Sequence, residues 1–255
     1  MLSALPSFFA EPSGIFLFFA GALAGGFING FAGFGTALFT LGFWLSIMPP
    51  LQAVSIIVIS SVATGAQGLW IVRKEMAQYP GRALRFVLPG IIGIPLGVSA
   101  LQAVNVDLLK LLIGLFLLCY GLFFMARATL PTLKGYYPLV DMFFGLIGGF
   151  LGGLAALSGA LPTFWLSLRE WPKGEIRAIL QPFNVTILLL TALMFLAQGV
   201  YTKSTLLLIM MSLPVSIFST QIGLALFKKL KDNHFRRMLI ILTFISGLSI
   251  LASIL

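Results

Sequence analysis

Hydrophobic residues form two unusually long runs in this chain, and glycines interrupt each run near its middle. The runs cover residues 14–46 and 137–168, so each holds about 30 residues where a membrane-spanning helix needs roughly 20. Such a run is too long for one crossing and too short for two. We therefore predict that each run enters a membrane, breaks near mid-depth and turns back as a helical hairpin. Non-helical backbone is tolerated at that depth where protein or a water-filled cavity shelters it.

Six further apolar runs have the length of single transmembrane helices. They cover residues 51–72, 84–104, 108–125, 176–196, 205–227 and 238–255. Residues 1–255 therefore predict one all-α, polytopic membrane domain made of two repeats, residues 14–126 and 137–255, each a hairpin followed by three spans. Because three is odd, the second repeat is expected to be inverted relative to the first, as in many secondary transporters.

Short internal matches support the predicted repeat. Gly25-Gly26-Phe27 is echoed by Gly148-Gly149-Phe150, and the Phe-Trp-Leu-Ser sequence at residues 43–46 is echoed at residues 164–167. A proline and an alanine-led span follow in both halves. Four matches in the same order favour a duplicated unit over coincidence.

Composition and charge place the chain in a membrane and orient it there. Hydrophobic residues make up 59% of the chain and charged residues 9%, which excludes a soluble domain of 255 residues. The net charge of +9 arises mainly from short stretches between apolar runs, at residues 73–85, 127–134, 169–177 and 228–237. The positive-inside rule explains these bases better than nucleic-acid binding and makes the four stretches cytoplasmic loops. The turns at residues 47–50, 105–107 and 198–203, and both termini, are then external, and residues 1–11 lack the basic region of a cleavable signal peptide.

The two predicted breaks are the first candidates for a binding site. They lie at residues 29–36 and 152–163, and after each the returning helix points its N-terminus into the membrane. Free N–H groups and the positive end of the helix dipole at two such termini would suit an anion. The alternative is that the glycines allow close helix packing in lipid, and for any single glycine this alternative is favoured.

The span after each hairpin is unusually polar and supplies further candidates. Hydroxyl and amide side chains there could bind substrate oxygens or could form hydrogen bonds between helices. Ser219, Thr220 and Gln221 are weaker candidates on a later span. The predicted substrate-binding residues are Asn29, Gly30, Gly33, Gly35, Thr36, Ser60, Thr64, Ser158, Gly159, Gln181 and Asn184.

Several kinds of chemistry have no support in the sequence. There is no P-loop, no Ser-His-Asp set and no metal-ligand cluster, so we expect neither an enzyme nor a cofactor. No ionisable residue lies clearly at mid-membrane. Asp141 is expected to snorkel or to pair at the interface near the cytoplasmic mouth. Arg177 begins the span that carries Gln181, where it could guard the inner mouth.

The chain resembles the sulfite exporter TauE/SafE family of bacterial membrane transporters over nearly its whole length. The resemblance rests on the glycine-rich residues 25–35, the alanine-led run with Ser60-Ser61, the repeat that begins at Gly148, and the tail of residues 223–237 followed by Gly247. It implies export or exchange of small anions, such as sulfite, sulfoacetate or other sulfonates, across the bacterial inner membrane. The second repeat departs from the family pattern at residues 155–158, and at Gln181 and Asn184, where small hydroxyls are usual.

Three functions remain open from the sequence. The favoured one is a secondary transporter that works by alternating access around a midplane site. The others are a passive anion channel of the same architecture and a membrane subunit without transport of its own. The expected partners are a small anion and the lipid bilayer, not nucleic acid, and a homodimer is compatible with the sequence.

Overall fold

The described part of the chain is helical throughout. The computed structural model describes residues 6–78, 80–125, 133, 135–169, 171–229, 244, 248 and 251, and among these there is no β-strand, only an isolated bridge between Leu133 and Arg169. The elements are η2 (Ser7–Ala10), α1 (Pro12–Ala32), α2 (Thr36–Trp44), α3 (Pro50–Gln78), α4 (Pro80–Ala103), α5 (Val106–Met125), α6 (Pro138–Ala155), α7 (Ala160–Ser167), α8 (Lys173–Ala197) and α9 (Lys203–Lys229).

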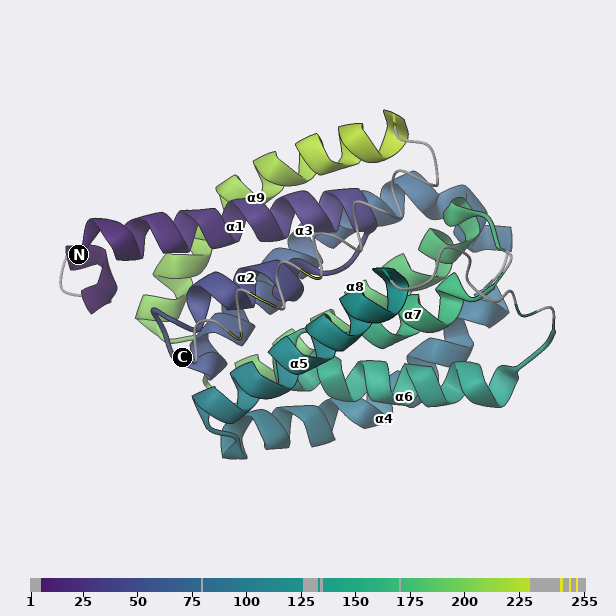
Figure 1. Cartoon of the computed structure of the whole chain (residues 1–255), viewed down its shortest axis with the longest axis horizontal. Coiled ribbons are helices and arrows are strands. Elements are labelled where there is room, and N and C mark those ends of the chain that lie inside the picture. Colours follow the sequence, from purple (N-terminus) through teal and green to yellow (C-terminus); the bar gives the residue numbers. More distant parts are fainter. Residues whose placement is uncertain are drawn as a thin grey trace.

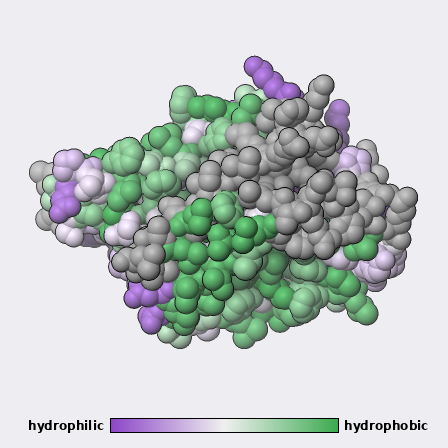
Figure 2. Space-filling model, viewed as in Figure 1, coloured by the Kyte–Doolittle hydropathy of each residue, from purple (hydrophilic) through white to green (hydrophobic). Residues whose placement is uncertain are grey.

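Within the described residues, six helices are long and apolar enough to cross a membrane: α1, α3, α4, α6, α8 and α9. Many large apolar side chains on them face outward, including Leu96, Met210 and Phe218, as expected for a surface in contact with lipid tails. In the coloured part of the face drawn in Figure 2, apolar residues predominate between the two ends and polar residues gather toward the ends. The prediction of an all-α polytopic membrane protein is confirmed.

The first long run forms the predicted hairpin. Helix α1 ends at Gly33, whose left-handed φ of 81° lets its N–H close the last turn on the Asn29 carbonyl at 2.8 Å. Helix α2 then returns along α1. The indole Nε1 of Trp44 donates to the Phe18 carbonyl at 2.9 Å, which holds the two limbs together.

The second long run folds in the same way. Helix α6 ends at Ala156 in the left-handed conformation, with φ of 57°, and the Ala156 N–H donates to the Gly152 carbonyl at 3.0 Å. Helix α7 returns along α6, and Trp165 Nε1 donates to the Asp141 carboxylate at 2.7 Å. Each hairpin therefore carries a tryptophan that ties its short returning limb to its long first limb.

Both breaks are shorter than predicted. The breaks were predicted at residues 29–36 and 152–163, but residues 29–32, 36, 152–155 and 160–163 are helical. The interruptions therefore cover residues 33–35 and 156–159. The reason is that most glycines serve helix packing. A Cβ on Gly30 would collide with the Thr220 carbonyl of α9, and one on Gly153 would lie 2.9 Å from the Val98 nitrogen of α4. Neighbouring helices thus keep these glycines helical.

The two halves of the chain exchange helices with each other. Helix α4 packs along α6 in the same direction, and α9 packs along α1 in the same direction, as the close approaches of Gly90 to Gly149 and of Gly223 to Phe27 show. In Figure 1 these pairs lie at opposite sides of the molecule. Helices α3 and α8 run antiparallel between them, since Gly65 meets Val185 and Gly68 meets Gln181.

Several basic residues expected in loops lie in helices instead. Arg73 and Lys74 belong to α3, Arg82 and Arg85 to α4, and Lys173 and Arg177 to α8. These helices continue past their apolar segments into the charged stretches. Parts of the predicted basic loops lie outside the described residues, namely residues 127–132, 134 and 230–237. So do most of the last predicted span and both chain ends.

Replacing Gly149 with alanine should destabilise the pairing of α4 with α6. A Cβ there would lie 2.7 Å from the Gly90 Cα, in backbone that cannot move aside, and overpacking of this kind costs about 1–3 kcal/mol. Thermal unfolding of the purified protein in detergent would measure the loss. Gly174→Ala is the control, because a Cβ there meets nothing within 4 Å. Equal melting temperatures for both variants would contradict the packing role.

Candidate functional site

A small buried cavity lies where the two hairpin breaks meet α3 and α8. Both breaks line it, together with Ser61 and Gly65 of α3 and Gln181 and Asn184 of α8. Its volume is about 10 Å³, which is room for about one water molecule. Asn184 lies near the middle of the 24-residue apolar segment of α8, so the cavity is level with the middle of that segment.

Asn184 joins the two breaks. Its Nδ2 donates to the Gly33 carbonyl at 3.3 Å, and its Oδ1 accepts a hydrogen bond from Ser158 Oγ at 2.9 Å. Gly159 packs so closely on this amide that a Cβ there would lie 2.8 Å from both Nδ2 and Oδ1. A single amide thus bonds a polar group of each interruption.

Gln181 lies one turn before Asn184 and faces the same cavity. Its Nε2 donates to the Gly65 carbonyl at 3.0 Å, while its buried Oε1 has no hydrogen-bond partner among the described residues. Pro182 follows at once inside α8. Because proline has no N–H, the helix forgoes one backbone hydrogen bond at this level, which leaves the amide-rich turn less constrained than a regular helix.

Asn29 links the first hairpin to α3. Its Nδ2 donates to Thr64 Oγ1 and, at 3.4 Å, to the Ser61 carbonyl. Thr64 Oγ1 in turn donates to the Ser60 carbonyl at 2.6 Å. Asn29 therefore lines the cavity, whereas Thr64 lies behind Asn29 and orients its side chain.

The electrostatics of the cavity come from helix ends and neutral side chains. Helices α2 and α7 begin at its wall, and neither Gly35 nor Gly159, their N-caps, offers a side chain to the N-terminal N–H groups. The hydroxyl oxygens of Thr36 and Ser61 are buried there without a partner among the described residues. Each helix N-terminus carries roughly half a positive charge, so the wall is rich in hydrogen-bond capacity and biased toward negative ligands.

The opposing helix ends are neutralised locally. The C-termini of α1 and α6 also reach the breaks, and their last carbonyls would repel an anion if left exposed. Gly33 N–H and Ala156 N–H cap these ends, and the Leu157 N–H donates to the Leu151 carbonyl at 3.0 Å. The N-termini of α2 and α7 are thus open to the cavity, while carbonyls at the C-termini of α1 and α6 are bonded within the protein.

Eight of the eleven predicted site residues line this cavity, and Gly30, Ser60 and Thr64 do not. Gly30 is a packing residue against α9, and Ser60 points away from the cavity wall. The prediction missed Ser61 and Gly65, which are four residues apart and share one face of α3. That spacing in the sequence could have identified both as cavity residues.

The weaker candidates Ser219, Thr220 and Gln221 are absent from the cavity lining. Thr220 Oγ1 donates to the Gly26 carbonyl at 2.9 Å, and Gln221 pairs with Gln67.

Arg177 comes closer to the first break than its position in the sequence indicated. Its guanidinium is buried, donates from Nη2 to the Gly30 carbonyl at 3.1 Å, and lies 4.3 Å from the centre of the Phe227 ring. A side chain that begins one turn outside the cavity therefore reaches the C-terminal end of α1.

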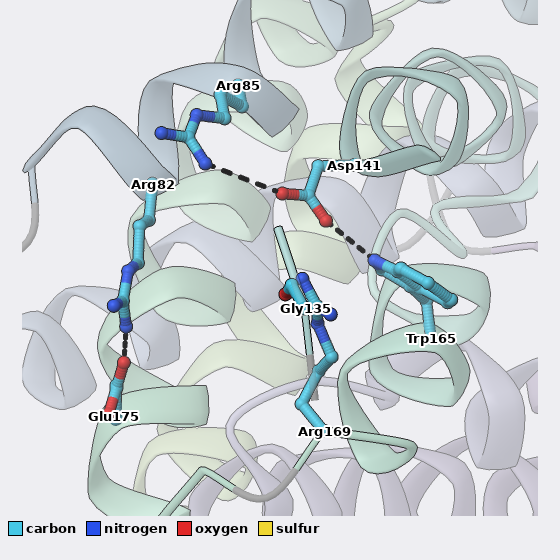
Figure 3. A network of polar contacts seen from close by, with 7 residues as sticks. All are labelled: Arg82, Arg85, Gly135, Asp141, Trp165, Arg169 and Glu175. Carbon is cyan, nitrogen blue, oxygen red and sulfur yellow. Dashed lines mark hydrogen bonds and ion pairs between the residues drawn. The ribbon is translucent and has the colours of Figure 1, made fainter. Parts of the chain in front are cut away.

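The other described charges near the second hairpin form a separate network at its predicted cytoplasmic end (Figure 3). Asp141 accepts the hydrogen bond from Trp165 and lies 3.8 Å from Arg85, Arg82 pairs with Glu175, and Arg169 donates to the Gly135 carbonyl at 2.8 Å. Asp141 is buried, not snorkelling, yet lies outside the cavity lining. Among the described residues, no three metal-binding side chains come together.

Comparison with known families identifies the protein's relatives. The sequence profile of the sulfite exporter TauE/SafE family matches residues 17–250, nearly the whole chain. The chain therefore belongs to this family. A search of curated protein sequences gave no match.

Replacing Asp141 with asparagine should leave folding and transport largely intact. An asparagine oxygen can still accept the Trp165 hydrogen bond, so the hairpin stays closed without the charge. Asp141→Leu should instead cost about 1–3 kcal/mol of unfolding free energy, since the buried indole N–H is left unpaired. Thermal unfolding and transport assays on both variants would measure this. A well-folded Asp141→Asn protein without transport would show that the carboxylate takes part in transport.

Proposed function

We propose that this member of the sulfite exporter TauE/SafE family is a secondary transporter of small oxyanions, such as sulfite, sulfoacetate or other sulfonates, across the bacterial inner membrane. Family membership already makes it a multi-pass membrane protein of the anion-exporter type. The observation that carries the finer proposal is the convergence of two broken hairpins on one buried polar cavity at mid-depth. Broken helices that meet at mid-membrane are the usual substrate site of such transporters.

The cavity chemistry favours an anion held by neutral groups. The uncapped N-termini of α2 and α7 supply positive potential, and Asn184, Gln181, Ser61, Ser158 and Thr36 supply hydrogen bonds. Neutral donors and helix dipoles bind more weakly than a full charge, which suits rapid release. None of the described cavity-lining residues is ionisable, so binding should depend little on pH from the protein side.

The size of the cavity supports alternating access. A volume of about 10 Å³ accommodates about one water molecule and excludes a sulfonate. The described conformation is therefore closed around its site, and the substrate enters only when the breaks move apart. Asn184 and Ser158 bridge the two breaks by side-chain hydrogen bonds of modest strength, which makes this the line along which the protein would open.

The inverted repeat is part of the same proposal, with one integral domain built from residues 14–126 and 137–255. The two equivalent tryptophans make similar contacts: Trp44 stacks on Phe18, and Trp165 stacks on Phe144, with interplanar angles of 11° and 7°. The exchanged pairs α1 with α9 and α4 with α6 are what a two-fold axis in the membrane plane would produce. Inversion allows one mechanism to open the site to either side.

Replacing Asn184 or Gln181 with leucine should weaken anion binding by about 1–3 kcal/mol each, since a buried hydrogen bond is lost. Counterflow in proteoliposomes, with sulfite and sulfoacetate as probes, would measure it. Gln221→Leu is the matched control, because it removes an amide outside the cavity. Gly159→Ala should act similarly by pushing Asn184 aside. It is a cleaner test than a change at Gly33, where φ of 81° would strain any side chain.

Two results would contradict the proposal. Wild-type transport rates in folded Asn184→Leu, Gln181→Leu and Gly159→Ala proteins would place the site elsewhere. Flux that neither saturates nor shows trans-stimulation would indicate a passive channel.

Cysteines at Ser46 and Ser167 should label from opposite sides of the membrane. These serines end the two Phe-Trp-Leu-Ser sequences, and each donates to the carbonyl three residues earlier, at 2.6 and 2.7 Å. Charge distribution places Ser46 outside and Ser167 inside. The measurement is impermeant thiol labelling of cells and inverted vesicles after replacement of Cys119. Labelling of both positions from the same side would rule out the inverted repeat.

A further inference from the structure

Arg177 is a buried cation that has no counter-ion among the described residues. Only 4% of the residue is exposed, and within the part of the chain that the structure describes no carboxylate lies within 4.0 Å of its guanidinium. Nη2 donates to the Gly30 carbonyl, but Nε and Nη1 are buried with no hydrogen-bond partner there. Two of its three nitrogens therefore have hydrogen-bonding capacity to spare.

The guanidinium lies beside the first break. A Cβ placed on Gly33 would be 3.2 Å from Arg177 Nε and 2.9 Å from Gln181 Oε1. Gly33 and Gln181 both line the cavity, and Arg177 is four residues before Gln181 on the same face of α8. The cation is thus one helical turn from the cavity, on the side that the charge distribution makes cytoplasmic.

No carboxylate among the described residues offsets the cost of burying Arg177. Removing a charge from water is costly even after the protein relaxes. The Phe227 ring and the C-terminal end of α1 attract the guanidinium, but each carries only partial negative charge. A structural role alone would be met by a neutral side chain at lower cost. The arrangement instead suits a cation that receives an anion.

We infer that Arg177 is a substrate-contacting residue that sets the charge specificity of the transporter, an inference that rests on the proposed function. Nε and Nη1 take negatively charged oxygens of the substrate at the inner side of the site, before or after it occupies the cavity. The ligand class is a small oxyanion, with dianions favoured over zwitterions of similar size.

The Gly30 hydrogen bond limits how tightly the anion is held. Arg177 gives up or weakens its bond to the end of α1 when it turns toward the substrate, and this loss offsets part of the charge attraction. A fixed, fully available cation would retain the anion, whereas a cation shared with a helix end can release it. Because the Gly30 hydrogen bond is lost or weakened when the substrate arrives, substrate binding is coupled to the C-terminal end of α1.

Measurement of KM for two probes of similar size would test this inference. Sulfoacetate carries a sulfonate and a carboxylate, whereas taurine carries a sulfonate and an ammonium. In proteoliposomes, Arg177→Gln should raise the KM for sulfoacetate by tenfold or more and change that for taurine far less, and Arg177→Lys should restore most of the preference. A purely structural role would affect both probes equally.

Arg73→Gln is the matched control. Arg73 also donates to one backbone carbonyl, at 2.9 Å, and lies over one aromatic ring, at 4.0 Å from the centre of Trp70, but it is exposed. It should leave both KM values unchanged. An unchanged preference in Arg177→Gln, with Asn184→Leu still impaired, would overturn the inference and leave the proposed function standing. Absence of saturable anion flux in the wild-type protein would overturn both.

Discussion

The structure depends on how backbone polar groups are satisfied where two helices stop inside a membrane. No water is present in the bilayer core to bond them, so each interruption must find its partners within the protein. Gly33 and Ala156 close the ends of α1 and α6 through left-handed residues. Asn184 then bonds one polar group of each break with a single amide. The breaks must therefore lie together, and a polar cavity between them is the result.

Close helix packing holds the breaks in register. Glycines on α1, α4, α6 and α9 bring backbone against backbone, and the pairs α1 with α9 and α4 with α6 join opposite halves of the chain. Packing of small residues is the main attraction available between helices in lipid, where tails are as apolar as side chains. Because each half of the chain supplies a helix to the other, we expect that neither hairpin can move without moving part of the opposite half.

The described charged residues near the second hairpin lie apart from the cavity. Asp141, Arg85, Arg82 and Glu175 form pairs at one end of the second hairpin, away from the cavity. The cavity lining is neutral, and among the described residues the cation that reaches the first break, Arg177, is bound to the end of α1. In the proposed transporter, anion attraction would come from helix ends and this shared guanidinium instead of a permanent ion pair. Such an arrangement would let the same site bind and release its substrate.

The sequence alone determined the hairpins, the spans and most cavity residues, because the length of an apolar run and the position of its glycines report directly on crossings and breaks. It also identified Gln181 and Asn184 as amides on one face of α8. Only the tertiary structure decided that Gly30 packs against α9, that Ser61 and not Ser60 lines the cavity, and that Arg177 reaches the first break. Helical periodicity defines which residues share a face, but it does not say which helix lies across that face, and that neighbour decides whether a residue packs or binds.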